Sequence, residues 1–322
     1  MHVLRSPEAT DELRQLLDPA IELTGGDDAL PPPAEIEILI DGRPTREDIE
    51  ACPGLRMLII PYAGIPEATR ELMLEFPHVA VHNLHHNASA ASELAIALFL
   101  AAAKRLIPAD RALRQGDWSI RYADGGDLLL QGKTALVLGL GAIGSLIARA
   151  CAGLGMHVIG IRRRLNLPLD ATIETHDLSS LLMILPQAAA LFVALPLTPE
   201  TRGLIGQREL TLLGKDAALV NVARGPIVDE QSLFQALSEG RLGAAGLDVW
   251  YQYPRDADER TSTFPSTFPF HKLDNVVLSP HRGGAYQRPE LERLRIEHLA
   301  CLLNAIPRGE PIPNRVDIEA GY

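Results

Sequence analysis

One stretch constrains the fold of this chain more than any other: Thr134-Ala-Leu-Val-Leu-Gly-Leu-Gly-Ala-Ile-Gly144. Its first five residues have the composition of a buried strand. Three glycines follow at fixed spacing, and the next segment, 145–152, contains good helix formers that carry an apolar stripe. The stretch therefore predicts a strand that turns tightly into a helix.

The three glycines meet different requirements of a dinucleotide-binding turn. Gly139 allows the tight turn, Gly141 leaves the backbone open to a pyrophosphate, and Gly144 lets the helix pack closely on its strand. The first N–H groups of the helix, at Ala142 and Ile143, would face the phosphates. A glycine-rich turn without a ligand is the simpler alternative, but the flanking strand and helix favour the binding turn.

Length and charge narrow the class of protein. A chain of 322 residues predicts two domains, and a net charge of −11 argues against a nucleic-acid-binding surface. The cysteines, Cys52, Cys151 and Cys301, are odd in number and far apart, which predicts neither disulfides nor zinc and fits a reducing cytoplasm. The acidic first thirty residues are unlike a signal peptide, and the most apolar segment, 94–103, is too short to cross a membrane.

The order of the predicted elements indicates α/β architecture with parallel sheets. Residues 1–35 are weakly patterned. The first series has strands at 35–40, 55–60 and 79–83 and helices at 67–75, 88–105 and 108–115. The second series begins at the glycine turn and has strands at 134–138, 157–161, 189–195, 217–222, 243–248 and 275–278, before a last helix at 287–306.

Arginines follow the second strand of the second series, at Arg162, Arg163 and Arg164. An acidic residue at this position would bind the ribose 2′-hydroxyl of NAD, whereas arginine can bind the 2′-phosphate of NADP. NADP(H) is therefore the preferred cofactor. Three solvated arginines on a loop are the simpler alternative, which keeps NAD(H) open.

Four further motifs follow the glycine turn. They are Ala194-Leu-Pro-Leu-Thr-Pro-Glu-Thr-Arg202, Val220-Asn-Val-Ala-Arg-Gly-Pro226, Gly246-Leu-Asp-Val249 and Ser279-Pro-His-Arg-Gly-Gly284. In their order and spacing the chain resembles the D-isomer-specific 2-hydroxyacid dehydrogenases, from roughly Leu55 to Gly284. The resemblance implies hydride transfer between C4 of a nicotinamide and C2 of a small 2-oxo or 2-hydroxy acid, in a cleft between two domains.

Two residues of these motifs match the family's catalytic positions. Arg224 comes just after a predicted strand, and its planar guanidinium can bind a carboxylate and polarise the adjacent carbonyl, as the family's arginine does. His281 also follows a strand, and imidazole titrates in the range needed for proton transfer. The resemblance implies that His281 is the general acid in reduction and the base in oxidation.

The third catalytic position departs from the family. Relatives usually have a glutamate five residues after the aspartate that corresponds to Asp248, where it raises the pKa of the histidine. Here Tyr253 occupies that position. Either Tyr253 hydrogen-bonds His281 directly, or a nearby acid reaches back, with Asp256, Asp258 and Glu259 as candidates. Formate dehydrogenases also have a neutral residue, glutamine, at this position, which keeps formate oxidation open as an alternative.

Substrate recognition is expected from the first series. The segment Pro61-Tyr-Ala-Gly-Ile65 matches the family loop whose backbone N–H groups bind the substrate carboxylate, so Ala63, Gly64 and Ile65 are candidates. Asn87 matches the asparagine that begins the next helix in the family, where it can equally be an N-cap. His86, beside His85, is a further candidate for the substrate site.

The resemblance also completes the set of cofactor-binding candidates. Together with the glycine turn, Arg162 and Arg163, it comprises Leu195, Pro196, Val222, Ala223, Asp248 and Gly283. The expected fold has two Rossmann-like domains, with a doubly wound cofactor domain (105–287) inserted in a smaller flavodoxin-like substrate domain (1–104 and 288–322). Family members are usually homodimers. A cofactor-sensing protein similar to the transcriptional corepressors of this fold is a further alternative.

Overall fold

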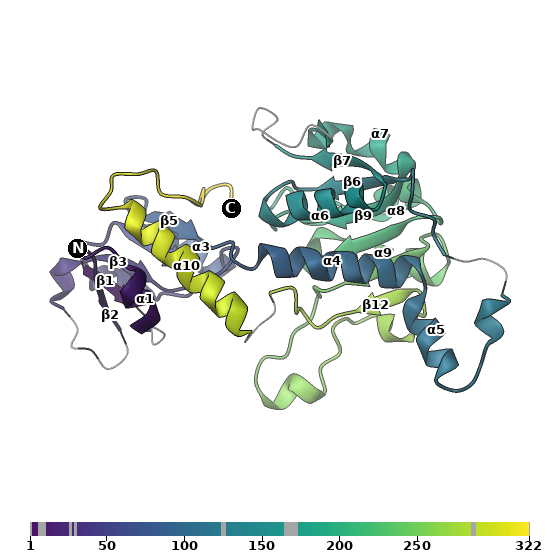
Figure 1. Cartoon of the computed structure of the whole chain (residues 1–322), viewed down its shortest axis with the longest axis horizontal. Helices are drawn as coiled ribbons and strands as arrows, with labels where there is room; N and C mark the ends of the chain where they lie inside the picture. Colours follow the sequence, from purple (N-terminus) through teal and green to yellow (C-terminus); the bar gives the residue numbers. More distant parts are fainter. Residues whose placement is uncertain are drawn as a thin grey trace. The chain divides into compact units, whose positions relative to one another are not determined.

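A computed structural model describes residues 2–5, 11–25, 28, 31–123, 127–163, 173–284 and 288–321 (Figure 1). The chain forms two compact units. The smaller unit contains Met1–Asn87 and Ala285–Tyr322, and the larger contains Ala88–Gly284. The larger unit is therefore inserted in the smaller one, as the sequence predicts. The predicted domain borders, after residues 104 and 287, differ from this division.

The smaller unit has a five-stranded parallel sheet. Its order is β2-β1-β3-β4-β5, which is the flavodoxin-like order. The strands are β1 (His2–Arg5), β2 (Glu22–Thr24), β3 (Ile36–Ile40), β4 (Met57–Ile60) and β5 (Ala80–Asn83). The helices are α1 (Asp11–Leu16), α2 (Arg46–Glu50), α3 (Glu67–Leu74) and α10 (Pro289–Ala305).

Apolar side chains cover both faces of this sheet. On β3, Ile38 and Ile40 belong to the cluster that includes Leu299 of α10, whereas Leu39 belongs to the opposite cluster with Met73 of α3. This alternation follows from the two-residue period of a strand. Because the sheet is buried on both faces, its strands read as nearly continuous apolar runs, which explains why β3, β4 and β5 are predictable.

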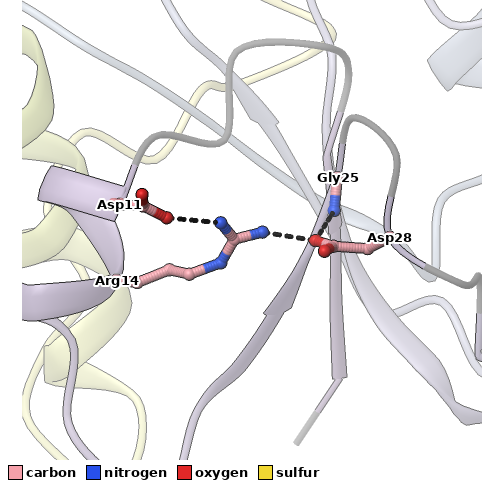
Figure 2. A network of polar contacts seen from close by, with 4 residues as sticks. All are labelled: Asp11, Arg14, Gly25 and Asp28. Atoms are coloured by element: carbon pink, nitrogen blue, oxygen red, sulfur yellow. Dashed lines mark hydrogen bonds and ion pairs between the residues drawn. The ribbon is translucent and has the colours of Figure 1, made fainter.

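The prediction missed β1, β2 and α1. Figure 2 shows how the exposed side of this region is held: Arg14 of α1 forms ion pairs with Asp11 and Asp28, and the backbone N–H of Gly25 donates to the Asp28 carboxylate. These contacts tie α1 to the segment that follows β2. Exposed ion pairs contribute little free energy, so the buried side chains of Leu13 and Leu23 stabilise the region more.

The larger unit has a seven-stranded parallel sheet in the order β12-β11-β10-β9-β6-β7-β8. This order reverses between β6 and β9, as in doubly wound dinucleotide-binding folds. The strands are β6 (Thr134–Leu138), β7 (His157–Ile161), β8 (Glu174–His176), β9 (Ala188–Val193), β10 (Ala218–Asn221), β11 (Ala244–Leu247) and β12 (Val276–Leu278). The predicted α/β fold with two parallel sheets is confirmed, although β8, which is short and polar, was not predicted.

Six α-helices are described in the larger unit: α4 (Ala88–Ala103), α5 (Leu106–Leu113), α6 (Ala142–Gly153), α7 (Leu181–Ile184), α8 (Gln207–Leu213) and α9 (Glu230–Ser238). Figure 1 shows α5 at the edge of this unit, beyond the end of α4. None of the helices in the described segments of the chain combines the length and the apolar character that crossing a membrane requires.

Packing explains why α4 groups with the larger unit. Its Phe99 contacts Phe192 of β9 edge-to-face, with ring centroids 5.1 Å apart. A Cβ atom on Gly246 of β11 would lie 2.8 Å from Cβ of Leu98, so only glycine allows this approach without a shift. The composition of α4 predicts a buried helix, but the complementary surface on β11 decides which sheet it covers.

Candidate active site

The glycine turn has the geometry expected of a dinucleotide-binding loop. Gly139 has a φ of 90°, and a Cβ atom there would lie 2.6 Å from the Ala194 carbonyl oxygen. A Cβ atom on Gly144 would lie 1.8 Å from the Gly139 carbonyl oxygen, so helix α6 packs directly on the turn. At Gly141, the N-cap of α6, a Cβ atom would meet nothing within 4 Å. Open space next to a helix N-terminus fits a bound pyrophosphate.

The arginines after β7 lie at the carboxyl end of the strand, next to β8. The backbone N–H of Arg162 donates to the His176 carbonyl at 3.0 Å, which continues the pairing of the two strands. Arg162 is half-buried and Arg163 is exposed, while Arg164 lies outside the described residues. The predicted contact of Arg162 and Arg163 with a ribose phosphate stays a prediction.

The loop after β9 carries Leu195 and Pro196 and is held by two buried threonines. The backbone N–H of Thr198 donates to Oγ1 of Thr201 at 2.8 Å, and that hydroxyl donates to the Pro196 carbonyl at 2.6 Å. Leu195 approaches the glycine turn, since its side chain would lie 3.1 Å from a Cβ atom on Gly139. This loop and the glycine turn therefore lie together at the point where the strand order reverses.

The turn after β10 presents Arg224 to solvent. Asn221, which is buried, accepts a hydrogen bond from the Ala223 N–H and donates one to the Arg224 carbonyl, both at 3.0 Å. The guanidinium of Arg224 also donates to the Ala223 carbonyl at 2.7 Å. Val222 and Ala223 are buried in this turn. The amide of Asn221 thus fixes the backbone from which the Arg224 side chain extends.

The carboxylate of Asp248 organises the turn that carries His281. Asp248 comes directly after β11 and is buried. Its carboxylate accepts hydrogen bonds from the Ser279 hydroxyl, the Arg282 N–H at 2.7 Å and the Gly283 N–H at 2.8 Å. His281 lies inside this turn with a φ of 56°. Left-handed backbone is unfavourable for a residue with a Cβ atom, so the three bonds hold a strained conformation. The predicted cofactor contacts of Asp248 and Gly283 stay predictions.

The structure pairs His281 with Tyr253. The phenolic oxygen of Tyr253 lies 3.0 Å from Nδ1 of His281, and the ring centroids are 5.6 Å apart. The three acidic alternatives, Asp256, Asp258 and Glu259, belong to a separate local turn in which Asp256 accepts from the Asp258 and Glu259 N–H groups. The neutral tyrosine therefore takes the place that a glutamate has in the family's motif.

Trp250 connects these turns. Its indole N–H donates to the Ser279 carbonyl at 2.8 Å, and its backbone N–H donates to the Tyr253 oxygen at 3.1 Å. Its carbonyl oxygen would lie 2.3 Å from a Cβ atom on Gly225, beside Arg224. Sequence analysis did not assign Asn221, Trp250 or Ser279 to the site. All three lie within or next to the motifs, but the Trp250 indole and the Ser279 hydroxyl have partners 29 and 31 residues away in sequence.

The charges around His281 favour its neutral form. Partial burial and the positive Arg224 both lower the pKa of His281, whereas the negative Asp248 opposes this change. Burial raises the pKa of Tyr253, although the Trp250 N–H and Arg224 act in the opposite direction. At neutral pH the pair therefore consists of an uncharged phenol and an uncharged imidazole, with a cationic guanidinium nearby.

The candidate substrate loop of the smaller unit follows β4. Gly64 has a φ of 79°, which explains a glycine at this position, and Ala63 and Ile65 on either side are half-buried. A Cβ atom on Gly42 would lie 2.1 Å from the phenolic oxygen of Tyr62, so the Tyr62 ring occupies the space beside Gly42. The loop therefore packs on a second loop of the same sheet, and its role in carboxylate binding stays a prediction.

His86 and Asn87 contain unpaired polar atoms. Nδ1 of His86 and Oδ1 of Asn87 are buried, and neither has a hydrogen-bond partner among the described residues. Burial lowers the pKa of His86 to about 4, and Arg295 and His298 of α10 add to this effect. The pKa of His85 is also lowered, by burial and by His298. Unpaired buried atoms cost free energy, which fits the predicted contact with a polar ligand.

Comparison with known proteins shows which family the larger unit resembles. Residues 96–283 match the family model described as "D-isomer specific 2-hydroxyacid dehydrogenase, NAD binding domain". A D-3-phosphoglycerate dehydrogenase of Methanocaldococcus jannaschii is 30% identical over 85% of this chain, and a glyoxylate reductase of Korarchaeum cryptofilum is 35% identical over 71%. The chain spans about half the length of the first relative (50%) and 66% of the second.

Solved structures show the same fold over the whole chain. The D-isomer specific 2-hydroxyacid dehydrogenase of Xanthobacter autotrophicus Py2, in complex with NADPH and MES, superposes with a TM-score of 0.79 at 28% identity. That match covers 99% of both chains. Both compact units therefore have counterparts in a single known structure.

The burial of His86 leads to a prediction about stability in acid. The unfolded chain binds the imidazole proton near pH 6.5, whereas the folded chain binds it only near pH 4. Stability must therefore fall as the pH drops through this window. We expect urea unfolding to show that His86→Gln reduces the loss of unfolding free energy between pH 7 and pH 4.5 by about 2 kcal/mol. The control is His157→Gln, at an exposed position of β7. An equal acid-induced loss in wild type and His86→Gln would contradict the prediction.

Proposed function

This chain belongs to the D-isomer specific 2-hydroxyacid dehydrogenase family, and we propose that it is an NAD(P)(H)-dependent oxidoreductase that interconverts a small 2-oxo acid and its 2-hydroxy acid. One observation carries the proposal. Arg224, Tyr253 and His281 follow three adjacent strands, β10, β11 and β12, at the edge of the sheet where ligands bind in such folds. The glycine turn lies at the same edge of the same sheet.

The residues of the larger unit have complementary chemistry. The guanidinium of Arg224 can bind a substrate carboxylate and polarise the neighbouring carbonyl. His281 lies close enough to Arg224 for the guanidinium charge to lower the pKa of its imidazole. Its imidazole can exchange a proton with the substrate oxygen. The turn from Gly139 to Gly144 would hold the pyrophosphate of the dinucleotide, whose nicotinamide supplies or accepts the hydride. In the smaller unit, Ala63, Gly64 and Ile65 would bind the carboxylate through their N–H groups.

Relatives indicate the size of the substrate. Several archaeal proteins with 31–36% identity to this chain are described as glyoxylate reductases. Glyoxylate is the smallest 2-oxo acid, so a substrate in this class carries a short side chain or none. We therefore propose glyoxylate and hydroxypyruvate as the first substrates to consider.

The proposal predicts that the protein oxidises NADPH or NADH with small 2-oxo acids. We expect Arg224→Gln to lower kcat/KM by about 100-fold, or about 2.7 kcal/mol, because the carboxylate loses its charged partner. The measurement is loss of nicotinamide absorbance with glyoxylate, hydroxypyruvate, pyruvate and longer 2-oxo acids. Arg208→Gln, at an exposed position of α8, is the control.

Two outcomes would contradict this function. Oxidation of formate without turnover of any 2-oxo acid would favour the formate dehydrogenase alternative. Tight cofactor binding with no turnover of either class would favour a cofactor-sensing protein.

The cofactor is proposed to be NADP(H). Arg162 and Arg163 follow β7 at the position where an acidic residue would select NAD, and the related structure from Xanthobacter autotrophicus Py2 was determined with NADPH. We expect Arg162→Asp to shift the ratio of kcat/KM values towards NADH by at least tenfold, or about 1.4 kcal/mol. Arg149→Asp, on the exposed side of α6, controls for loss of charge alone. An unchanged ratio would exclude Arg162 from phosphate binding.

The expected homodimer has a candidate surface in the larger unit. Helix α5 contains no buried residue. Because an isolated helix of eight residues has marginal stability in water, α5 needs packing partners to be stable. Apolar side chains are exposed on α5 and in the segment after it: Leu106 (56%), Ile107 (41%), Leu113 (51%), Trp118 (60%) and Tyr122 (78%). The ion pair between Arg111 and Asp274, at 2.9 Å, attaches α5 to the rest of the unit. We propose that a second copy covers this surface.

Light scattering would test the dimer. We expect twice the chain mass for wild type and a monomer for the double variant Leu106→Glu, Leu113→Glu, because two charges would be buried unpaired. Met183→Glu, which changes an exposed apolar residue of α7, should leave the dimer intact. A monomeric wild type, or a dimer that survives the double substitution, would overturn the proposed surface.

A further inference from the structure

The phenolic oxygen of Tyr253 has two described hydrogen-bond partners, a backbone amide and a ring nitrogen. The backbone N–H of Trp250 donates to it at 3.1 Å, and Nδ1 of His281 lies 3.0 Å away. A phenolic oxygen can accept hydrogen bonds but has only one proton to donate. Because the Trp250 amide can only donate, the phenolic proton is available for the nitrogen of His281. If Tyr253 donates this proton, Nδ1 carries none and the imidazole proton lies on Nε2.

We propose that Tyr253 and His281 form a proton relay, in which Tyr253 donates to Nδ1 while Nε2 delivers a proton to the oxygen of the substrate. This inference rests on the proposed 2-oxo acid reduction. It assigns Tyr253 a function different from that of the glutamate in the family's motif, since a carboxylate accepts a hydrogen bond from Nδ1–H and stabilises an imidazolium ion.

The charged and titratable groups around His281 support a relay through neutral groups. Arg224, from the turn after β10, disfavours a positive imidazole, while Asp248 favours one. Asp248 is itself bound to three donors of the turn, so its charge is already well compensated. The net effect, together with burial, is a lowered pKa for His281. An imidazolium ion would also direct its Nδ1–H at an oxygen that already accepts from Trp250.

The relay balances in protons and electrons. The carbonyl carbon would accept a hydride from the reduced nicotinamide, which is the reductant of the proposed reaction, as the π electrons move to the oxygen. That oxygen forms a bond to the proton of Nε2, whose bonding electrons stay on the ring. Nδ1 then binds the phenolic proton as the O–H bond of Tyr253 breaks. The resting state returns when Nε2 takes a proton from water and Nδ1 gives its proton back to the phenolate.

The surroundings of Tyr253 fit a transient phenolate. Tyr253 is 46% exposed, so water can solvate the phenolate until Nδ1 returns the proton. The Trp250 N–H donates to the oxygen, and Arg224 provides a nearby positive charge, and both effects favour the anion. Burial, the largest effect, raises the pKa of Tyr253 and keeps the phenol protonated between turnovers.

The hydrogen bond can be tested without substrate or cofactor. We expect long-range proton–nitrogen NMR spectra of the full ¹⁵N-histidine-labelled chain near pH 8 to show His281 with a proton on Nε2 and a hydrogen-bonded, unprotonated Nδ1. His281→Gln identifies the signals. In Tyr253→Phe the Nδ1 signal should shift to the position of a nitrogen without a donor. A proton on Nδ1 in wild type, or an Nδ1 signal unchanged by Tyr253→Phe, would overturn the relay.

The pH dependence of reduction separates a relay from a structural role. Wild type should keep its kcat to alkaline pH, because Tyr253 is the proton source. Tyr253→Phe depends on imidazolium, so its kcat should fall about tenfold for each pH unit above the pKa of His281. The difference between the two should therefore be smallest at the acidic end of the profile. Ser238→Ala, which removes an exposed hydroxyl at the end of α9, is the control.

A second variant keeps the test decisive if Tyr253→Phe folds poorly. Tyr253→Glu introduces an acceptor for Nδ1–H, so reduction should persist with a decline above a raised His281 pKa. Parallel pH profiles for wild type, Tyr253→Phe and Tyr253→Glu would refute the relay. If wild type reduces no 2-oxo acid, the proposed function fails, whereas the NMR experiment still decides on the hydrogen bond.

Discussion

The buried carboxylate of Asp248 is the interaction on which the geometry of the site depends most. A buried charge is costly unless it is fully hydrogen-bonded, and here one hydroxyl and two backbone N–H groups satisfy it. In return, these bonds hold His281 in left-handed backbone, which a residue with a Cβ atom rarely adopts. The backbone N–H of Asp248 donates to the Asn221 carbonyl at 3.0 Å. The same residue therefore connects the turn of Arg224 with the turn of His281.

Trp250 holds the site through both its backbone and its ring. Its amide orients the Tyr253 oxygen, its indole N–H binds the carbonyl next to Pro280, and its carbonyl excludes every side chain at position 225. The three turns are thus held by hydrogen bonds and close contacts inside one compact unit. Such an arrangement positions charged and polar groups before a ligand binds, which lowers the reorganisation that catalysis requires.

A tyrosine beside the histidine changes the chemistry of the site. A carboxylate would stabilise a positive imidazole, whereas a phenol that already accepts from an amide favours a neutral one. The smaller unit also contains neutral histidines, since burial lowers the pKa of His82, His85 and His86. Only His82 of these has a described hydrogen bond, between Nδ1 and the Pro313 carbonyl at 2.7 Å. The unpaired Nδ1 of His86 therefore distinguishes that residue as a ligand-binding candidate.

The sequence by itself determined the glycine turn, most strands of both sheets and the order of the catalytic motifs. These features depend on local rules, namely glycine at crowded or left-handed positions and apolar runs in buried parallel strands. Only the tertiary structure decided that Tyr253, and not Asp256, Asp258 or Glu259, lies beside His281. It also decided that α4 packs on β11 and that Asp248 binds the turn of His281. These contacts join residues far apart in the chain, and the path of the loop between them, which packing determines, leaves no local pattern in the sequence.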